Sequence, residues 1–200
     1  MRAPPASERG RRGNGGEHMS DPDQDFRVET TLRDGTAVTI RVMRPDDRQR
    51  LIAAFAKLDP STIYTRFFSY RKEIPEPALE RIGEIDFVEL AGLIATIGAG
   101  DDETVIGGAS YVGDIGEDGK RFAEVAFTIE EDYQGQGLAT KLFGALAAIA
   151  RRHGIARFTA DVLSGNAAML KVFARAGLPL RRQRESGVLH IELELEPQPS

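Results

Sequence analysis

The segment EEDYQGQGLATKLFG, residues 130–144, constrains the fold more than any other part of the chain. It follows an alternating apolar run and leads into a stretch with an apolar residue at every third or fourth position, the pattern of an amphipathic helix. Gly135 and Gly137 leave the backbone almost bare where that helix begins. The first N–H groups of a helix lack partners and carry a partial positive charge, so this helix start is suited to bind an anion.

Two familiar phosphate-binding motifs do not fit this segment. A P-loop needs a lysine followed by serine or threonine after its second glycine, and GQGLAT has neither at that place. A dinucleotide-binding fingerprint needs a third glycine where Thr140 stands. A glycine-rich turn from strand to helix that binds no ligand is the remaining alternative from the residues alone.

The rest of the chain alternates between strand and helix patterns, which predicts an α+β domain. We expect a mixed central sheet of six to seven strands with about four helices. The predicted strands are 37–43, 86–99, 103–114, 121–131 and 157–163, with a hairpin or bent strand at 179–195. The clearest predicted helices are 48–58, 60–70, 138–149 and 166–177, the last with Asn166 as N-cap and Gly177 as its stop.

Composition argues against several classes of function. The chain has 200 residues, 41% of them hydrophobic, and no run near the roughly 20 apolar residues of a membrane helix, so we expect one cytoplasmic domain, as a monomer or homodimer. It has no cysteine, and its three histidines show no metal-ligand spacing, so no metal is expected. The net charge of -5 argues against nucleic acid but allows a small anionic ligand and a basic protein partner.

Both ends of the chain are predicted to be tails. Residues 1–25 contain no Ile, Val, Leu, Phe or Tyr, so they cannot bury enough apolar area to offset their ordering entropy. We interpret them as disordered or as a remnant of cloning. The folded domain is expected to span 26–196, followed by a polar tail at 197–200.

The glycine segment and its surroundings resemble the GNAT superfamily of N-acyltransferases. QGQGLA matches the Gln/Arg-x-x-Gly-x-Gly/Ala pattern of that family, with Gln134, Gly137 and Ala139 at the pattern positions. SGNAAMLKVFARAGL resembles the family's asparagine-containing helix, and the resemblance extends from about Val38 to Leu195. LRDGTAVTIRVMRPDD, YTRFF and AEVAFTIEEDYQGQG are most similar to the acetyltransferase domain of Pat-type bacterial protein lysine acetyltransferases.

The resemblance implies a GNAT fold whose strands splay apart at an acyl-CoA site, with acetyl-CoA as the acyl donor. One set of residues would cradle the pyrophosphate with its backbone: Gln134, Gly135, Gln136, Gly137, Leu138, Ala139 and Thr140. The backbone of Phe127, Thr128 and Ile129 would bind the pantetheine arm like an added strand, and one N–H would polarise the thioester carbonyl. Asn166 would contact the cofactor, and a purely structural N-cap role is the alternative.

A base is expected because a lysine amine, with a pKa of about 10.4, is almost entirely protonated at neutral pH. Glu124 matches the glutamate that Pat-type enzymes use as general base. Its alternating strand suggests a carboxylate set among apolar neighbours, a setting that favours a base, although a solvated strand face is the common alternative. Glu130, Glu131 and Asp132 are expected to form an exposed acidic patch that steers a cationic substrate.

One position departs from the family. Many members have a tyrosine on the last helix that protonates the departing thiolate, whereas this chain has Phe173, which is expected in the core. Water or Ser164 would then take that role. The predicted function is acetyl-CoA-dependent N-acetylation of an amine, with a protein lysine favoured. A small-molecule amine acetyltransferase and a non-catalytic acyl-CoA-binding module are the alternatives, and residues 61–83 are expected to form the acceptor pocket.

Overall fold

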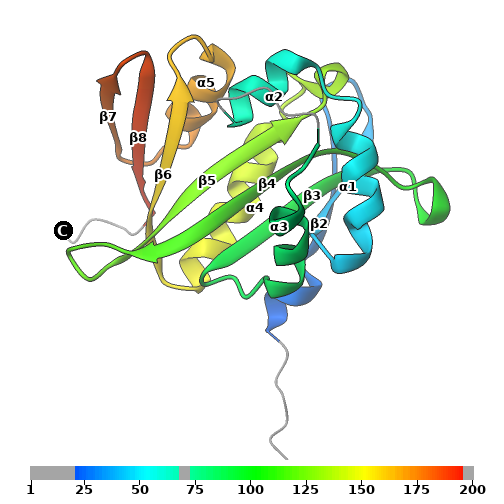
Figure 1. Cartoon of the computed structure of the whole chain (residues 1–200), viewed down its shortest axis with the longest axis horizontal. Helices are drawn as coiled ribbons and strands as arrows, with labels where there is room; N and C mark the ends of the chain where they lie inside the picture. Colours follow the sequence, from blue (N-terminus) through cyan, green and yellow to red (C-terminus); the bar gives the residue numbers. More distant parts are fainter. Residues whose placement is uncertain (1–20, 68–72, 196–200) are drawn as a thin grey trace, which may run out of the picture.

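A computed structural model describes residues 21–67 and 73–195 and contains an eight-stranded sheet (Figure 1). The strand order is β1-β2-β3-β4-β5-β6-β8-β7. The strands are β1 (Arg27–Thr31), β2 (Ala37–Val42), β3 (Leu90–Ile97), β4 (Thr104–Ile115), β5 (Arg121–Ile129), β6 (Ile155–Leu163), β7 (Leu180–Glu185) and β8 (Val188–Glu194). The helices are α1 (Arg48–Phe55), α2 (Pro60–Phe67), α3 (Glu76–Glu80), α4 (Leu138–Arg152) and α5 (Ala167–Arg175).

The predicted mixed α+β sheet is confirmed, with more strands than expected. The closing segment 179–195 forms a hairpin, β7 and β8, that turns at Ser186 and Gly187. Strand β1 was not predicted, because four of its five residues are exposed and it lacks an apolar face. The whole sheet is antiparallel except for one parallel pair, β5 and β6.

Strands β5 and β6 pair over only part of their length. Their last paired residues are Glu124 and Thr159, yet β5 continues to Ile129 and β6 to Leu163. Beyond that pair, β5 remains hydrogen-bonded to β4 and β6 to β8. The two strands therefore splay apart, as predicted, and split the sheet at its centre (Figure 1).

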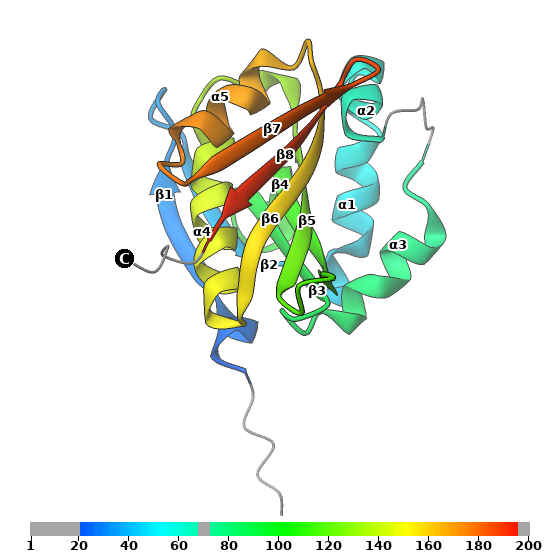
Figure 2. The same ribbon diagram turned by 90° about the vertical axis from the view of Figure 1, so that its left-hand side faces the viewer.

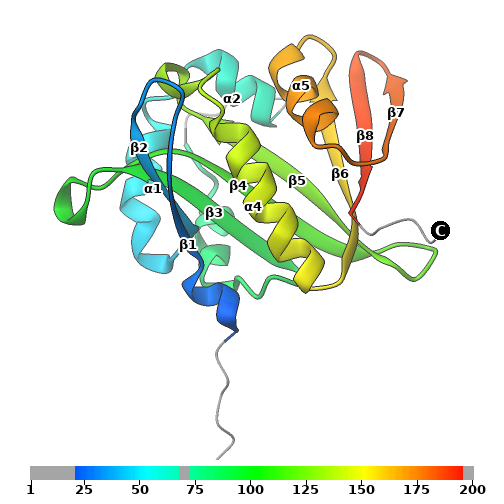
Figure 3. The same cartoon turned by 180° about the vertical axis from the view of Figure 1, so that it is seen from behind.

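Helices cover both faces of the sheet. Figure 2 shows α1, α2 and α3 on one side, and α4 and α5 on the other. Seen from behind in Figure 3, α4 crosses the central strands. Its Leu142, Leu146 and Ile149 are fully buried against strand residues such as Tyr111 and Phe158. This apolar layer fixes where α4 begins, and therefore where its N-terminus points.

A buried ion-pair network anchors the start of α1. Arg41 of β2 is 5% exposed and donates to both carboxylate oxygens of Asp47, at 2.7 and 2.6 Å. Asp47 is fully buried immediately before α1, and Glu103 also accepts from Arg41, at 3.0 and 3.1 Å. Because each buried charge has a partner, the network holds α1 against the sheet.

The folded part begins earlier than residue 26. Pro22–Asp25 form a short 3-10 helix, and Asp23 is 5% exposed because Arg152 and His153 at the end of α4 bind its carboxylate. The tail predicted for residues 1–25 is therefore shorter by at least its last five residues, and its remainder lies outside the described part of the chain. The predicted polar tail at 197–200 also lies outside it.

Candidate functional site

The split between β5 and β6 opens into a cavity of about 700 Å³, bounded by the start of α4 and by α5. Ten of the eleven predicted cofactor residues line this cavity: Phe127, Thr128, Ile129, Gln134, Gly135, Gly137, Leu138, Ala139, Thr140 and Asn166. Gln136 does not line it, and its carbonyl oxygen accepts from the backbone N–H of Arg33. The fold thus gathers residues from β5, the glycine segment and α5 around one space.

The free edge of β5 faces this cavity. Glu130 donates its N–H to Ile106 of β4, and strand alternation then directs the backbone groups of Phe127 and Ile129 away from β4 and toward the split. The carbonyl oxygen of Ile129 accepts from the side chain of Gln134, which agrees with that direction. Thr128 differs from the expectation, because alternation turns its backbone toward β4. An extended ligand lying in the split would meet the N–H groups of Phe127 and Ile129.

The glycines give the helix start its shape. Gly135 and Gly137 have φ values of 70° and 92°, in the left-handed region that favours glycine. Gly137 is the N-cap of α4. The peptide dipoles of the fifteen residues of α4 are aligned, and their positive end lies at this N-terminus. A Cβ at Gly135 would meet no atom within 4 Å, so the backbone here is open to a ligand. The arrangement suits a phosphate group.

Three cations that no sequence pattern indicated also line the cavity: Arg33, Lys171 and Arg175. Arg33 lies in the turn between β1 and β2, and its guanidinium donates to the carbonyl oxygen of Gly135 at 2.9 Å. Lys171 and Arg175 lie on α5. Anionic groups in the cavity would therefore meet cations from two sides in addition to the helix N-terminus.

Asn166 has the structural role that was left open. Its side-chain oxygen accepts from the N–H of Met169 at 3.1 Å, which caps α5, and the residue also lines the cavity. Both interpretations of this residue are therefore compatible with its position.

Glu124 lies at the closed end of the split, opposite Thr159. Its side chain shares a face of β5 with Ala126 and Thr128, the face covered by α1–α3, and β4 places Val112 beside it. The residue is exposed, which corresponds to the solvated strand face that the sequence left open as the alternative. Glu124 is not among the residues that line either cavity, and its exposure leaves the carboxylate accessible to a substrate.

The predicted acidic patch is also different. Only Asp132 of the three acids is exposed. Glu131 accepts from the backbone N–H of Asp59, which ties the start of α2 to the segment after β5. Glu130 lines a second cavity on the other face of the sheet.

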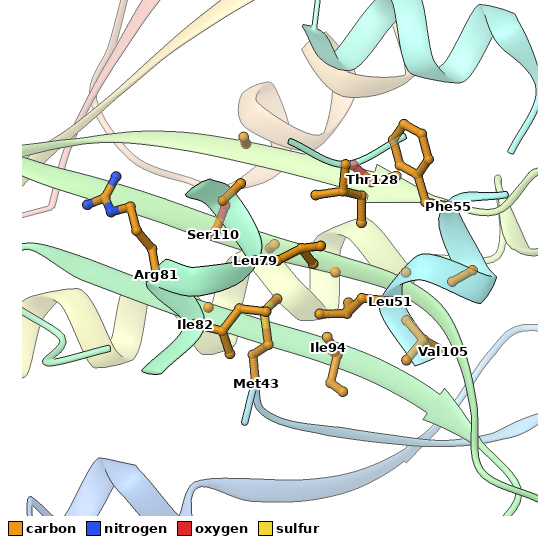
Figure 4. Close-up of a pocket in the computed structure, with 18 of the residues that line it drawn as sticks. Met43, Leu51, Phe55, Leu79, Arg81, Ile82, Ile94, Val105, Ser110 and Thr128 are labelled. Atoms are coloured by element: carbon orange, nitrogen blue, oxygen red, sulfur yellow. The ribbon is translucent and has the colours of Figure 1, made fainter. Parts of the chain in front are cut away.

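That second cavity has a volume of about 300 Å³ and lies between β3–β5 and the helices α1 and α3 (Figure 4). Its walls are mostly apolar side chains, among them Leu51, Phe55 and Leu79. The sheet leaves room for the cavity because Gly92, Ser110 and Ala126 form one row of small residues across the three strands. Thr128, in the next row, lines both this cavity and the split.

Phe173 is 1% exposed and packs edge-on against Phe127 and Phe143, with ring centroids 6.1 and 5.9 Å away. It is a core residue, as predicted, and offers no proton. Ser164 is exposed and is not among the residues lining the split.

Within the described residues, one group of side chains could hold a metal ion: Asp21, Asp23 and His153, whose ligand atoms lie within 4.8 Å of one another. Arg152 already binds both oxygens of Asp23, at 2.5 and 3.0 Å, and it lowers the pKa of that carboxyl through these hydrogen bonds. The group therefore functions as an ion pair between the first described residues and α4. In the part of the chain that the structure describes, no helix combines the length and apolarity needed to cross a membrane.

A split mixed sheet that offers a free strand edge and a helix N-terminus to one ligand suits an extended molecule that carries a phosphate group. Comparison with known proteins identifies the family to which this fold belongs. Residues 59–178 match the model of the acetyltransferase (GNAT) family. Acetyltransferase Pat of Mycolicibacterium smegmatis is 34% identical over 170 residues, which are 85% of this chain and 49% of that protein. Acetyltransferase PA5475 of Pseudomonas aeruginosa is 30% identical over 162 residues, covering 80% of this chain and 86% of that protein.

The solved GNAT domain of S. lividans PAT superposes with a TM-score of 0.74 at 35% identity, over 84% of this chain and 96% of that chain. The chain belongs to the acetyltransferase (GNAT) family. It spans about half the length of the Pat protein that it matches.

Proposed function

We propose that this protein is an acetyl-CoA-dependent N-acetyltransferase that acetylates a lysine side chain of a protein. The observation that carries the proposal is the split of the sheet. One cavity joins a free strand edge to a glycine-bounded helix N-terminus. Glu124, which is not among the residues that line this cavity, lies at the last strand pair before β5 and β6 separate.

In this proposal, the N-terminus of α4 and the cations Arg33, Lys171 and Arg175 bind the phosphates of coenzyme A. The free edge of β5 binds the extended pantetheine arm. The N–H of Phe127 or Ile129 donates to the thioester carbonyl and stabilises the negative charge that develops on its oxygen during attack.

Glu124 acts as the general base. It takes a proton from the acceptor ammonium, and the freed nitrogen attacks the carbonyl carbon, so that a C–N bond forms and the C–S bond breaks. The electron pair of the C–S bond leaves on sulfur. The nitrogen of the adduct then loses its second proton. With Phe173 buried and Ser164 outside the cavity, water accepts that proton and delivers one to the thiolate, while the first proton leaves Glu124 for solvent.

A protein lysine is favoured as acceptor for two reasons. Glu124 is exposed, so a side chain on a large partner can reach it. The relatives reported above include two Pat proteins, and the resemblance that pointed to this acceptor is to their acetyltransferase domain.

The test is to incubate the purified protein with acetyl-CoA and a cell lysate, and to map acetylated lysines by mass spectrometry. A Glu124→Gln protein serves as the matched control for non-enzymatic acetylation. Sites that appear with the wild type alone support the proposal. Equal acetylation in both samples would contradict it.

A further inference from the structure

We propose that the apolar cavity under α1 and α3 is an acyl-chain pocket, and that the enzyme uses saturated acyl-CoAs longer than acetyl-CoA. The inference rests on the proposed function for the transfer step, but the binding of acyl-CoA tests it separately.

The cavity and the split share one lining residue, Thr128, beside the proposed thioester site. Thr128 lies on β5 between Phe127 and Ile129, whose backbone faces the split, and it lines the split and the apolar cavity alike. A thioester carbonyl bound at these residues would have its acyl group beside Thr128. An acetyl methyl ends there, whereas a longer chain could continue past Thr128 into the cavity.

The shape of the cavity is set by the sheet. Three small residues, Gly92, Ser110 and Ala126, stand in one cross-strand row where larger side chains would fill the space under the helices. A Cβ at Gly92 would already contact Ile85 and Met43 at 3.4 Å. The roof is aliphatic and aromatic, with Phe55, Leu79 and Ile82 each less than 10% exposed. A volume of about 300 Å³ is far more than a methyl group needs.

The charges near the cavity select among acyl groups. Glu130 lines it and comes directly after β5, two positions beyond Thr128. A carboxylate there repels an acyl group that ends in a carboxylate of its own. The one cation among the described lining residues, Arg81, is exposed and already lies 3.7 Å from Glu84, so burying such a group among the mostly apolar walls is costly. Saturated chains are therefore favoured over dicarboxylic ones of equal length. Transfer itself is unchanged: a C–N bond forms, the C–S bond breaks, and the pair leaves on sulfur.

The experiment is a calorimetric titration of the wild type with acetyl-, butanoyl-, hexanoyl- and succinyl-CoA, without acceptor. Each buried methylene is expected to increase affinity about three- to four-fold. Hexanoyl-CoA has about four more methylenes than acetyl-CoA, so it should bind about ten-fold tighter even if about two of them are buried. Butanoyl-CoA should bind tighter than succinyl-CoA, which has the same number of acyl carbons. Affinity that is flat or falls with chain length would overturn the proposal.

Two adjacent positions on α1 give matched variants. Ala54 lines the cavity, whereas Ala53 is exposed and is not among its lining residues. Ala54→Leu should fill part of the space and reduce the affinity ratio of hexanoyl- to acetyl-CoA several-fold, and Ala53→Leu should leave the ratio at the wild-type value. Ser110→Leu fills the cavity from the opposite side and should reduce the ratio too.

The alternative occupant is the acceptor, because Ile74, Leu79 and Ile82 line the cavity and belong to the region 61–83 that was expected to form the acceptor pocket, of which 68–72 lie outside the described residues. If the cavity holds part of the acceptor, Ala54→Leu raises KM for an acceptor peptide and leaves the acyl-chain ratio unchanged, which would contradict the proposal. Failure of the proposed function gives a different result. No amine is acetylated, but affinity still increases with acyl-chain length in the wild type, and this increase is still reduced in Ala54→Leu.

Discussion

The guanidinium of Arg33 donates a hydrogen bond of 2.9 Å to the carbonyl oxygen of Gly135, which lies 102 positions further along the chain. The backbone N–H of Arg33 also donates to Gln136. The turn between β1 and β2 therefore supports the glycine segment directly and adds a cation to the cavity that the segment borders.

Arg33→Met should weaken binding of coenzyme A by about ten-fold or more, since hydrogen bonds to charged groups are stronger than neutral ones. Calorimetric titration at two salt concentrations measures this. The variant should also show a weaker dependence on salt, because one cation facing the phosphates is gone. Arg27→Met on β1, outside the cavity, is the matched control and should bind like the wild type. Equal affinities for all three proteins would remove Arg33 from the site.

Gly137→Asp should abolish measurable binding of coenzyme A. The residue has a φ of 92°, which strains a side chain, and the new carboxylate would stand at the helix N-terminus where a phosphate is proposed to bind. Gly144→Asp makes the same change on the same helix, at an exposed glycine whose Cβ would meet no atom within 4 Å. That control should bind normally. Wild-type affinity in a folded Gly137→Asp protein would refute the phosphate site.

Glu103→Gln should lower the free energy of unfolding at neutral pH by about 1–3 kcal/mol, because Glu103 accepts from the buried Arg41 and from Thr96. Those hydrogen bonds, with Arg41 first, hold the pKa of the Glu103 carboxyl below its usual value of 4.5. A depressed pKa stabilises the fold above the unfolded value and loses this contribution as the pH falls below it.

Urea unfolding of the wild type and Glu103→Gln between pH 3 and 7 checks this. The difference between the two proteins should be largest near pH 7 and should shrink below about pH 4.5. Glu117→Gln, at an exposed turn, is the control and should match the wild type throughout. A difference that grows with acidity would contradict the assignment.

The sequence predicted the parts of the site that depend on neighbouring residues. Glycines at a helix start and the N-cap at Asn166 are local features, and both are found where the patterns placed them. The acid patch was wrong because Glu131 binds Asp59, a partner that local spacing cannot show. Arg33 and the small-residue row of the second cavity were missed for the same reason, since strand register and a turn docked from far away create them.

The central claim is that Glu124, at the last pair before the strands separate, takes the proton of an amine attacking a thioester in the split. Glu124→Gln keeps the size of the side chain and removes its basicity. The most direct test measures turnover against pH for both proteins, with acetyl-CoA and one lysine peptide identified by the lysate experiment.

Turnover of Glu124→Gln should be about 10²–10⁴-fold lower at neutral pH. It should partly recover as the pH rises toward the lysine pKa of about 10.4, where more of the amine is already deprotonated. Affinity for acetyl-CoA, titrated in parallel, should change little, because the residues proposed to bind it lie elsewhere in the split. A variant with wild-type turnover at neutral pH would contradict the account.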